Sequence, residues 1–149
     1  MKRAHGQLSD DDFGRLLEFR DGLRRFLHWS GEQARKVGLT PTQHQLLLAV
    51  RGHGGPPSIG DVAEHLLLRH HSVVELVDRT VRAGLVERVV DEHDQRVVRL
   101  RLTEEGDDTL VRLSAAHLVE LSRVRDQLRP LWAHLPDTPA NGAGRPAPA

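Results

Sequence analysis

Apolar residues recur at helical spacing over most of the chain, and polar capping residues mark where each helix begins. Ser9, followed by three aspartates, predicts the start of a first amphipathic helix that ends near Gly38. Thr40 and Gln43 form a capping box for a second helix, which stops near Gly52. The first third of the chain is therefore expected to be helical.

Two shorter helical patterns follow, and only a few residues separate them. The first begins with Ser58 and Asp61, which resemble another capping box. The second has apolar residues at helical spacing from Val73 to Val81, and Gly84 provides its C-terminal stop. Two short amphipathic helices joined by a tight turn predict a helix-turn-helix.

The period of the pattern then changes from helical to alternating. Residues 86–90 and 97–102 are rich in β-branched residues, and a polar turn at 91–96 separates them. A hairpin directly after a helix-turn-helix is the wing of a winged helix. The predicted fold class is therefore mainly α with a small β-wing.

A last long helix is predicted after the hairpin. Thr103 caps it, and apolar residues from Leu110 to Leu128 form a stripe suited to packing against another helix. Pro130 is expected to break or kink this helix before one more short apolar turn.

Composition excludes several functions. The chain of 149 residues has no cysteine, so disulfides, thiolate nucleophiles and cysteine-bound zinc are excluded. No catalytic motif is found, which argues against an enzyme, and no cofactor is implied. We see neither a signal peptide nor an apolar run of membrane-spanning length, and we expect a cytoplasmic protein that does not contact a membrane.

Charge argues mildly against DNA binding. The 21 basic residues balance the 21 acidic ones, whereas DNA-binding proteins usually carry a basic excess. Residues 69–102 contain seven arginines and six acidic residues, so the net positive charge of this segment is small. A DNA-binding interpretation therefore depends on the pattern of elements and not on net charge.

Five short segments, in order, resemble MarR-family regulators. They are residues 39–47 (LTPTQHQLL), 59–64 (IGDVAE), 76–79 with 84–88 (LVDR, GLVER), 94–96 (DQR) and 102–106 (LTEEG). The ordered resemblance covers about residues 13–128. It implies a homodimer whose paired winged helices bind a pseudo-palindromic DNA operator, as a repressor that a small aromatic or amphipathic ligand releases.

The resemblance also implies a division of the chain. Residues 9–135 would form one MarR-like domain, with dimerisation helices at 9–38 and 103–135 and the DNA-binding winged helix at 39–102. Residues 1–8 and 136–149 are expected to be disordered, the second because it is rich in proline, alanine and glycine.

The sequence departs from the family pattern at three positions. Leu67 stands where a turn glycine is usual, and Arg69 stands where a serine or threonine usually caps the recognition helix. Glu75 occupies a position where a polar or basic base-reading residue is common.

The candidate DNA contacts come from the recognition helix and the wing. They are Arg69, His70, His71, Ser72, Val74, Glu75, Arg79, Arg88, Arg96 and Arg99, with Arg101 as a further phosphate candidate. The first half of the helix reads base edges in the major groove, and Arg96 is suited to a narrow minor groove. Asp94 would hold Arg96 or the turn in shape. For Arg79 an intramolecular ion pair is the alternative, and for Arg99 and Arg101 a solvated strand face.

A candidate effector pocket and two rival functions complete the predictions. The pocket residues are His28, Trp29, His44 and Trp132, for which core packing is an equally good explanation. No metal-ligand set is evident among the ten histidines. The alternatives to a DNA-binding regulator are a winged-helix protein-interaction module and a metal sensor.

Overall fold

The computed structural model describes residues 8–133 and 135, and these form five helices and one two-stranded sheet. The elements are α1 (Asp10–Lys36), α2 (Pro41–Gly52), α3 (Ile59–Leu66), α4 (His70–Arg82), β1 (Val86–Val90), β2 (Val98–Leu102) and α5 (Glu104–Trp132). This confirms the predicted mainly α fold with a small β-wing. The segments expected to be disordered lie outside the described residues, apart from Leu8.

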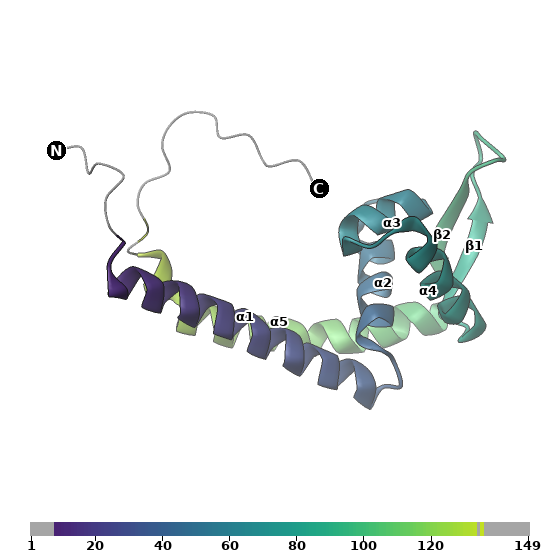
Figure 1. Ribbon diagram of the computed structural model, residues 1–149. Helices are drawn as coiled ribbons and strands as arrows, with labels where there is room; N and C mark the ends of the chain where they lie inside the picture. Colours follow the sequence, from purple (N-terminus) through teal and green to yellow (C-terminus); the bar gives the residue numbers. More distant parts are fainter. Residues whose placement is uncertain (1–7, 134, 136–149) are drawn as a thin grey trace.

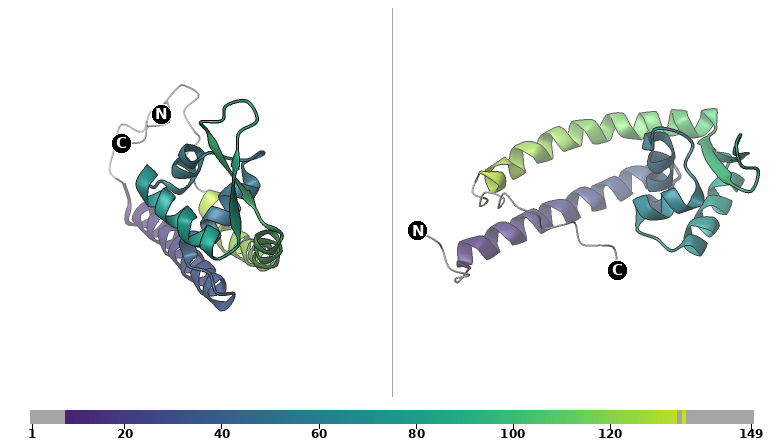
Figure 2. Two further views of the ribbon diagram at one scale, coloured as in Figure 1. Left: turned by 90° about the vertical axis from the view of Figure 1, so that its right-hand side faces the viewer. Right: turned by 90° about the horizontal axis from the view of Figure 1, so that it is seen from above.

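The molecule has two parts, a winged lobe and a pair of long helices (Figures 1 and 2). The winged lobe consists of α2, α3, α4, the hairpin and the adjoining ends of α1 and α5. The remaining lengths of α1 and α5 run side by side in opposite directions away from the lobe. We call these lengths the helix pair.

Capping boxes fix the starts of three helices, as the sequence predicts. In α2 the hydroxyl of Thr40 accepts a hydrogen bond from Gln43 N over 3.1 Å, and the Gln43 side chain accepts from Thr40 N over 2.9 Å. Ser9 with Asp12 and Ser58 with Asp61 make the same reciprocal bonds at α1 and α3. Each box satisfies two of the backbone N–H groups that a helix start leaves without partners.

The core lies in the winged lobe. Its fully or almost fully buried side chains include Leu46, Leu47, Val62, Val73, Leu76, Val77, Val86 and Leu100. Ala34 of α1 and Leu110 and Leu113 of α5 complete it from the lobe ends of the long helices. The core therefore joins α3 and α4 to the hairpin and, through α2, to the long helices.

The hairpin is antiparallel, and its register runs from the pair Val86↔Leu102 to the pair Val90↔Val98. Leu100 is fully buried, and its N–H donates to Pro57 O over 2.8 Å. The loop before α3 thereby fastens the middle of the hairpin ladder to the lobe.

The expected break at Pro130 is wrong, because α5 continues through this residue to Trp132. Packing stabilises the last turn: Leu131 is buried, and the Trp132 ring meets the Phe19 ring of α1 edge-on at 5.3 Å between centroids. The proline has no backbone N–H to donate within the helix, so this packing offsets a lost helical hydrogen bond.

Candidate nucleic-acid interface

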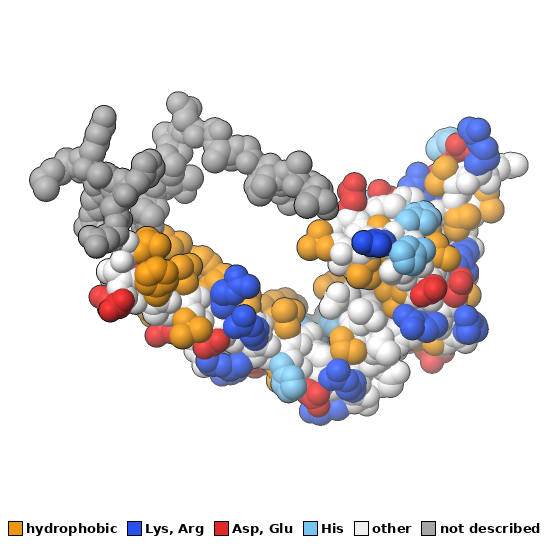
Figure 3. All heavy atoms as spheres, in the orientation of Figure 1, with side chains coloured by type: hydrophobic (Ala, Val, Ile, Leu, Met, Phe, Trp, Pro, Cys, Tyr) orange, Lys and Arg blue, Asp and Glu red, His pale blue; other side chains and the backbone are white. Residues whose placement is uncertain are grey.

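Helix α4 presents a polar face to the outside of the lobe. Its buried residues Val73, Leu76, Val77 and Thr80 point into the core. On the other side Arg69, His70, His71, Glu75 and Arg79 are exposed, while Ser72 and Val74 are half-buried. Figure 3 shows basic and histidine side chains on the visible surface of the lobe. The residues predicted from the sequence to read bases therefore share one accessible helix face.

The turn into α4 explains how the chain tolerates two of its departures from the family pattern. Leu67 adopts the left-handed conformation with φ of 54°, the region that a glycine favours. Arg69 is the N-cap of α4, and its side chain makes no capping hydrogen bond. The chain thus forms the turn with Leu67 in place of glycine, and it begins α4 with Arg69 in place of a capping serine or threonine.

Arg96 stands at the tip of the hairpin, and its side chain is 91% exposed. Asp94 accepts hydrogen bonds from the backbone N–H and the Nε of Arg96, both over 3.1 Å. These bonds lower the pKa of the Asp94 carboxyl, the side-chain bond most. Asp94 therefore stays ionised and holds Arg96 in place while leaving its guanidinium accessible.

The other wing arginines are engaged in ion pairs within the chain. Arg88 pairs with Asp78 of α4, and Arg101 pairs with Glu87 across the hairpin over 2.9 Å. Both pairs are largely exposed, so a phosphate can replace the carboxylate at small cost.

Arg99 is held more firmly than the other two. Its Nε donates to Asp91 over 2.8 Å, and its Nη1 lies 3.5 Å from Asp61 of α3. Arg99 and Asp91 are only 32% and 18% exposed, so their pair is better shielded from water than those of Arg88 and Arg101.

Asp91 is a functional candidate that the sequence reasoning missed. Its Oδ1 accepts hydrogen bonds from His93 N and Asp94 N, each over 2.8 Å. The hydrogen bond from Arg99, followed by these two, lowers the pKa of Asp91 to about 2. An aspartate that accepts backbone bonds two and three residues ahead is typical of polar turns, which was the available signal. For Asp61, the second carboxylate that contacts Arg99, the sequence predicts only a helix cap, because nothing in the spacing indicates a contact with the hairpin.

The histidines among the described residues do not gather into one site. His65 makes a 2.9 Å contact with His53 of the loop before α3, away from His70 and His71. Among residues 8–133 and 135, no group of three or more histidine, aspartate or glutamate side chains is placed to hold a metal ion. Nor is any helix in this part of the chain long and apolar enough to cross a membrane.

Two of the four candidate effector residues meet at the junction of α1, α2 and α5. The rings of Trp29 and His44 lie 4.8 and 4.7 Å from that of His117, between centroids. His117 Nδ1 donates to Leu113 O, and its Nε2 is hydrogen-bonded to the Ser30 hydroxyl, both over 2.7 Å. We call Phe26, Trp29, Ser30, His44 and His117 the His117 cluster.

Burial disfavours the charged form of one member of this cluster, His44. His44 is only 6% exposed. Its burial, and then the charge interaction with His117, lower the pKa of His44. The remaining two candidates lie elsewhere: His28 is exposed on α1, and Trp132 packs on Phe19 at the far end of the helix pair.

Comparison with known proteins gives a match to one family. Residues 37–97 match the MarR family. The HTH-type transcriptional repressor MdtR of Bacillus subtilis (strain 168) is 33% identical over 76 residues, which cover 51% of this chain and 48% of that protein. The chain thus aligns with about half the length of this curated relative.

Solved structures support the same assignment. A MarR family protein from Bacillus stearothermophilus has a TM-score of 0.67 and 28% identity, over 80% of this chain and 83% of that chain. A mutant of E. coli MarR complexed with operator DNA has a TM-score of 0.60 and 21% identity, over 77% and 78% of the two chains.

The winged lobe thus matches the MarR family, and the fold of the described chain is similar to that of a solved MarR-family protein. Both the resemblance seen in the sequence and the predicted fold are confirmed. The prediction that the chain is not an enzyme is confirmed too, because this is a family of transcription regulators.

Proposed function

We propose that the protein is a sequence-specific DNA-binding transcriptional regulator that binds a pseudo-palindromic operator as a homodimer. The observation that carries the proposal is the pairing of two exposed elements on one lobe. The outer face of α4 has the width and polarity to enter a major groove, and Arg96 extends 91% exposed from the wing tip. The groove next to the one that α4 occupies is a minor groove, whose negative potential attracts arginine.

The residues on α4 define what it would recognise. Arg69 is suited to guanine O6 and N7, Glu75 to the amino group of cytosine, and Val74 to a thymine methyl. His70, His71 and Ser72 add hydrogen-bonding groups to the same end of the helix. Arg79 lies further along, where contact with phosphate is expected.

An unpartnered apolar face supports the homodimer. Apolar side chains are 42–61% exposed along α1 and 44–73% exposed along α5. They are Phe13, Leu16, Leu17, Leu23 and Leu27 on α1 and Val111, Leu118, Val119 and Leu121 on α5. Apolar side chains exposed in such a row are typical of an interaction surface, and a second copy with the same row can cover it around a two-fold axis.

Repression and release by a ligand form the finer part of the proposal. The similarity to MdtR, a repressor, favours repression. The His117 cluster lies between the long helices and α2, where a small aromatic ligand could change the separation of the two lobes of a dimer. Trp29 and His44 are the contacts we expect, and the distant Trp132 is not expected to share the same ligand.

One observation favours a second candidate function, a protein-interaction module. The chain has no net charge, and Arg88, Arg99 and Arg101 are all paired internally. A winged helix that has lost DNA binding needs no free arginines on its wing.

A binding titration separates the two functions. Protein is titrated against the DNA upstream of its own gene, with scrambled DNA as competitor, at about 50 and 200 mM salt. We expect competitor-resistant, salt-sensitive binding that Arg96→Ala weakens by about tenfold, the effect of losing one specific groove contact. The control Arg125→Ala removes an exposed arginine from the helix pair and leaves affinity unchanged. Equal affinity for both DNAs, tested also with random pools, would support the protein-interaction module.

The homodimer is tested by light scattering with a charge placed on the apolar face. Leu118 is 66% exposed on α5, and Leu118→Glu is expected to convert the dimer to monomer. Leu48 is 53% exposed on α2, away from the helix pair, so Leu48→Glu is the matched control and should remain dimeric. A monomeric wild-type protein would contradict this part of the proposal.

A further inference from the structure

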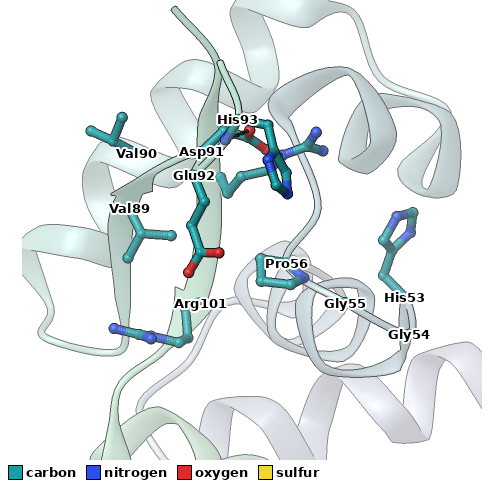
Figure 4. A pocket seen from close by; sticks show the side chains of 11 residues that line it. His53, Gly54, Gly55, Pro56, Val89, Val90, Asp91, Glu92, His93 and Arg101 are labelled. Atoms are coloured by element: carbon teal, nitrogen blue, oxygen red, sulfur yellow. Dashed lines mark hydrogen bonds and ion pairs between the residues drawn. The ribbon is translucent and has the colours of Figure 1, made fainter. Parts of the chain in front are cut away.

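Arg99 joins the hairpin to the helix-turn-helix. It lies on the hairpin face that is turned toward the loop before α3, where a groove runs between the two. Its Nε donates to Asp91 at the end of the hairpin ladder over 2.8 Å, and its Nη1 lies 3.5 Å from Asp61 in the first turn of α3. Figure 4 shows Asp91 on the hairpin, across this groove from His53 of the loop. We call the contact of Arg99 with these two carboxylates the Arg99 bridge.

On the hairpin side, hydrogen bonds continue from the bridge to the wing tip. Asp91 Oδ1 accepts from the backbone N–H of Asp94 over 2.8 Å. The Asp94 carboxylate in turn holds the backbone and Nε of Arg96. A displacement of Asp91 is therefore transmitted to the arginine that we expect in the minor groove.

On the other side, the bridge ends on a residue that is fixed to the helix-turn-helix. Asp61 belongs to the capping box of α3 and accepts a hydrogen bond from Ser58 N over 2.8 Å. His53 Nε2 lies 3.7 Å from the same carboxylate. Helix α3 packs directly against α4, so Asp61 holds a fixed position relative to the base-reading face.

The backbone holds the hairpin ladder at residues 99 and 100 without help from the Arg99 side chain. Leu100 N donates to Pro57 O, and Ser58 pairs with Arg99 through a backbone bridge. These contacts survive a change of the Arg99 side chain. The bridge therefore acts on the outer end of the hairpin, beyond the last ladder pair of Val90 and Val98.

We propose that Arg99 is a positioning residue for DNA recognition: it sets the place of the wing-tip Arg96 relative to α4 and does not itself bind phosphate. This inference rests on the proposed function. The duplex fixes the separation of adjacent major and minor grooves, so a protein that enters both must hold its two elements at a matching separation. Holding them before binding also removes an ordering cost. A planar guanidinium can contact two carboxylates in different directions, which a lysine ammonium cannot do with the same geometry.

The first experiment measures wing position without DNA. The chain contains no cysteine, so Gln95→Cys at the wing and Glu64→Cys on α3 give two unique spin-label sites. Labelled protein is mixed with excess unlabelled protein, so that only distances within one protomer are observed. We expect a narrow distance distribution that becomes broader in Arg99→Met and in Arg99→Lys.

The matched control is Arg101→Met, which removes an arginine from the same strand and hairpin face. Arg101 pairs with Glu87 inside the hairpin, so its loss should leave the distance distribution narrow. Asp61→Asn keeps an oxygen for the α3 cap but removes the charge that faces Arg99, and it should broaden the distribution. An unchanged distribution in both Arg99→Met and Asp61→Asn would overturn the inference.

The second experiment measures DNA affinity against salt. As a positioning residue, Arg99 leaves the salt slope unchanged when it becomes lysine, yet affinity falls roughly tenfold, as for one lost groove contact. In the Arg99→Met background, Arg96→Ala should then have little further effect, because the two losses are not additive. A phosphate ligand behaves differently: lysine keeps its affinity, and methionine lowers the salt slope by about 0.9.

The results separate this inference from the proposed function. If wild-type protein discriminates its operator but Arg99 follows the phosphate pattern, the positioning role is wrong and DNA binding stands. If wild-type protein does not discriminate any DNA while the label distance still depends on Arg99, the proposed function fails and the bridge remains a structural contact only.

Discussion

The winged lobe and the helix pair differ in how far they bury their apolar side chains within one protomer. In the lobe, Val62, Val73, Val77 and Leu100 are fully buried, and the hairpin and three helices share one core. Along the helix pair, α1 buries only Gly31 and Ala34, both at its lobe end. The lobe is thus complete within one protomer, whereas the helix pair leaves its apolar residues exposed for another surface.

This difference separates folding from assembly. A substitution in the lobe should change the stability of each protomer, because its contacts lie within one chain. A substitution on the exposed face of the helix pair should change how protomers associate, because its contacts lie in the proposed dimer. The same substitution is therefore expected to change protomer stability in the lobe and protomer association in the helix pair.

Leucine to alanine gives the largest contrast. Leu100 is fully buried, so Leu100→Ala is expected to lower the free energy of unfolding by about 2–5 kcal/mol. Leu118 is 66% exposed, and Leu118→Ala should change monomer stability by less than about 0.5 kcal/mol. Urea unfolding at two protein concentrations measures both, and only the Leu118 variant should show a changed concentration dependence. A stability loss in Leu118→Ala that is independent of concentration would contradict the comparison.

Two glycines give the next contrast. A Cβ on Gly106 would lie 2.0 Å from the carbonyl oxygen of Leu85, whereas one on Gly14 of the helix pair meets nothing within 4 Å. Gly106→Ala should destabilise the lobe by about 1–3 kcal/mol or more, since the obstructing atom belongs to the backbone. Gly14→Ala should stabilise α1 by about 0.5–1 kcal/mol. Thermal unfolding of the two variants and of wild type gives the sign of each change in stability. Equal changes in the two variants would show that the backbone at Gly106 has room for a Cβ beside Leu85.

Acid should act on the junction between the two regions. Burial lowers the folded-state pKa of His44 below the ordinary value of 6.5, so the unfolded chain takes up this proton at higher pH. As the pH falls through 6.5 and then through the folded pKa, the unfolded state binds more protons and stability decreases. His44→Gln should flatten the profile of urea unfolding between about pH 7.5 and 5.5. The exposed His28→Gln serves as control, and a profile that His44→Gln leaves unchanged would contradict this assignment.

Much of the fold could be predicted because its signals are local. The capping pairs at Ser9, Thr40 and Ser58 lie within four residues of their partners, and the change to alternating residues at Val86 is visible in the sequence. The expectation for Pro130 was wrong for the opposite reason. The contact of Trp132 with Phe19 comes from another helix, and no local pattern contains it.

The candidate site could be predicted only in outline. Periodicity identifies which residues of α4 face outward, but it does not show that Arg99 meets Asp61, 38 residues away. Similarly, Trp29 and His44 were named as pocket residues, while the contact of both with His117 depends on how three helices pack. Ion pairs and ring contacts between distant segments follow from tertiary packing, which a single sequence does not encode in its spacing.

The smallest expected effect concerns the turn of the helix-turn-helix. Leu67 has φ of 54° and is 84% exposed, so its side chain gains little from burial while its backbone is strained. A non-glycine residue in this region costs roughly 1–2 kcal/mol, but glycine also increases the entropy of the unfolded chain. Leu67→Gly should therefore raise the free energy of unfolding by less than about 1 kcal/mol. Gly38→Leu, at φ of 82°, introduces the same strain at the end of α1 and should have the opposite sign. If Leu67→Gly instead destabilises the protein, the entropy that glycine adds to the unfolded chain outweighs the relieved strain, and the predicted sign is wrong.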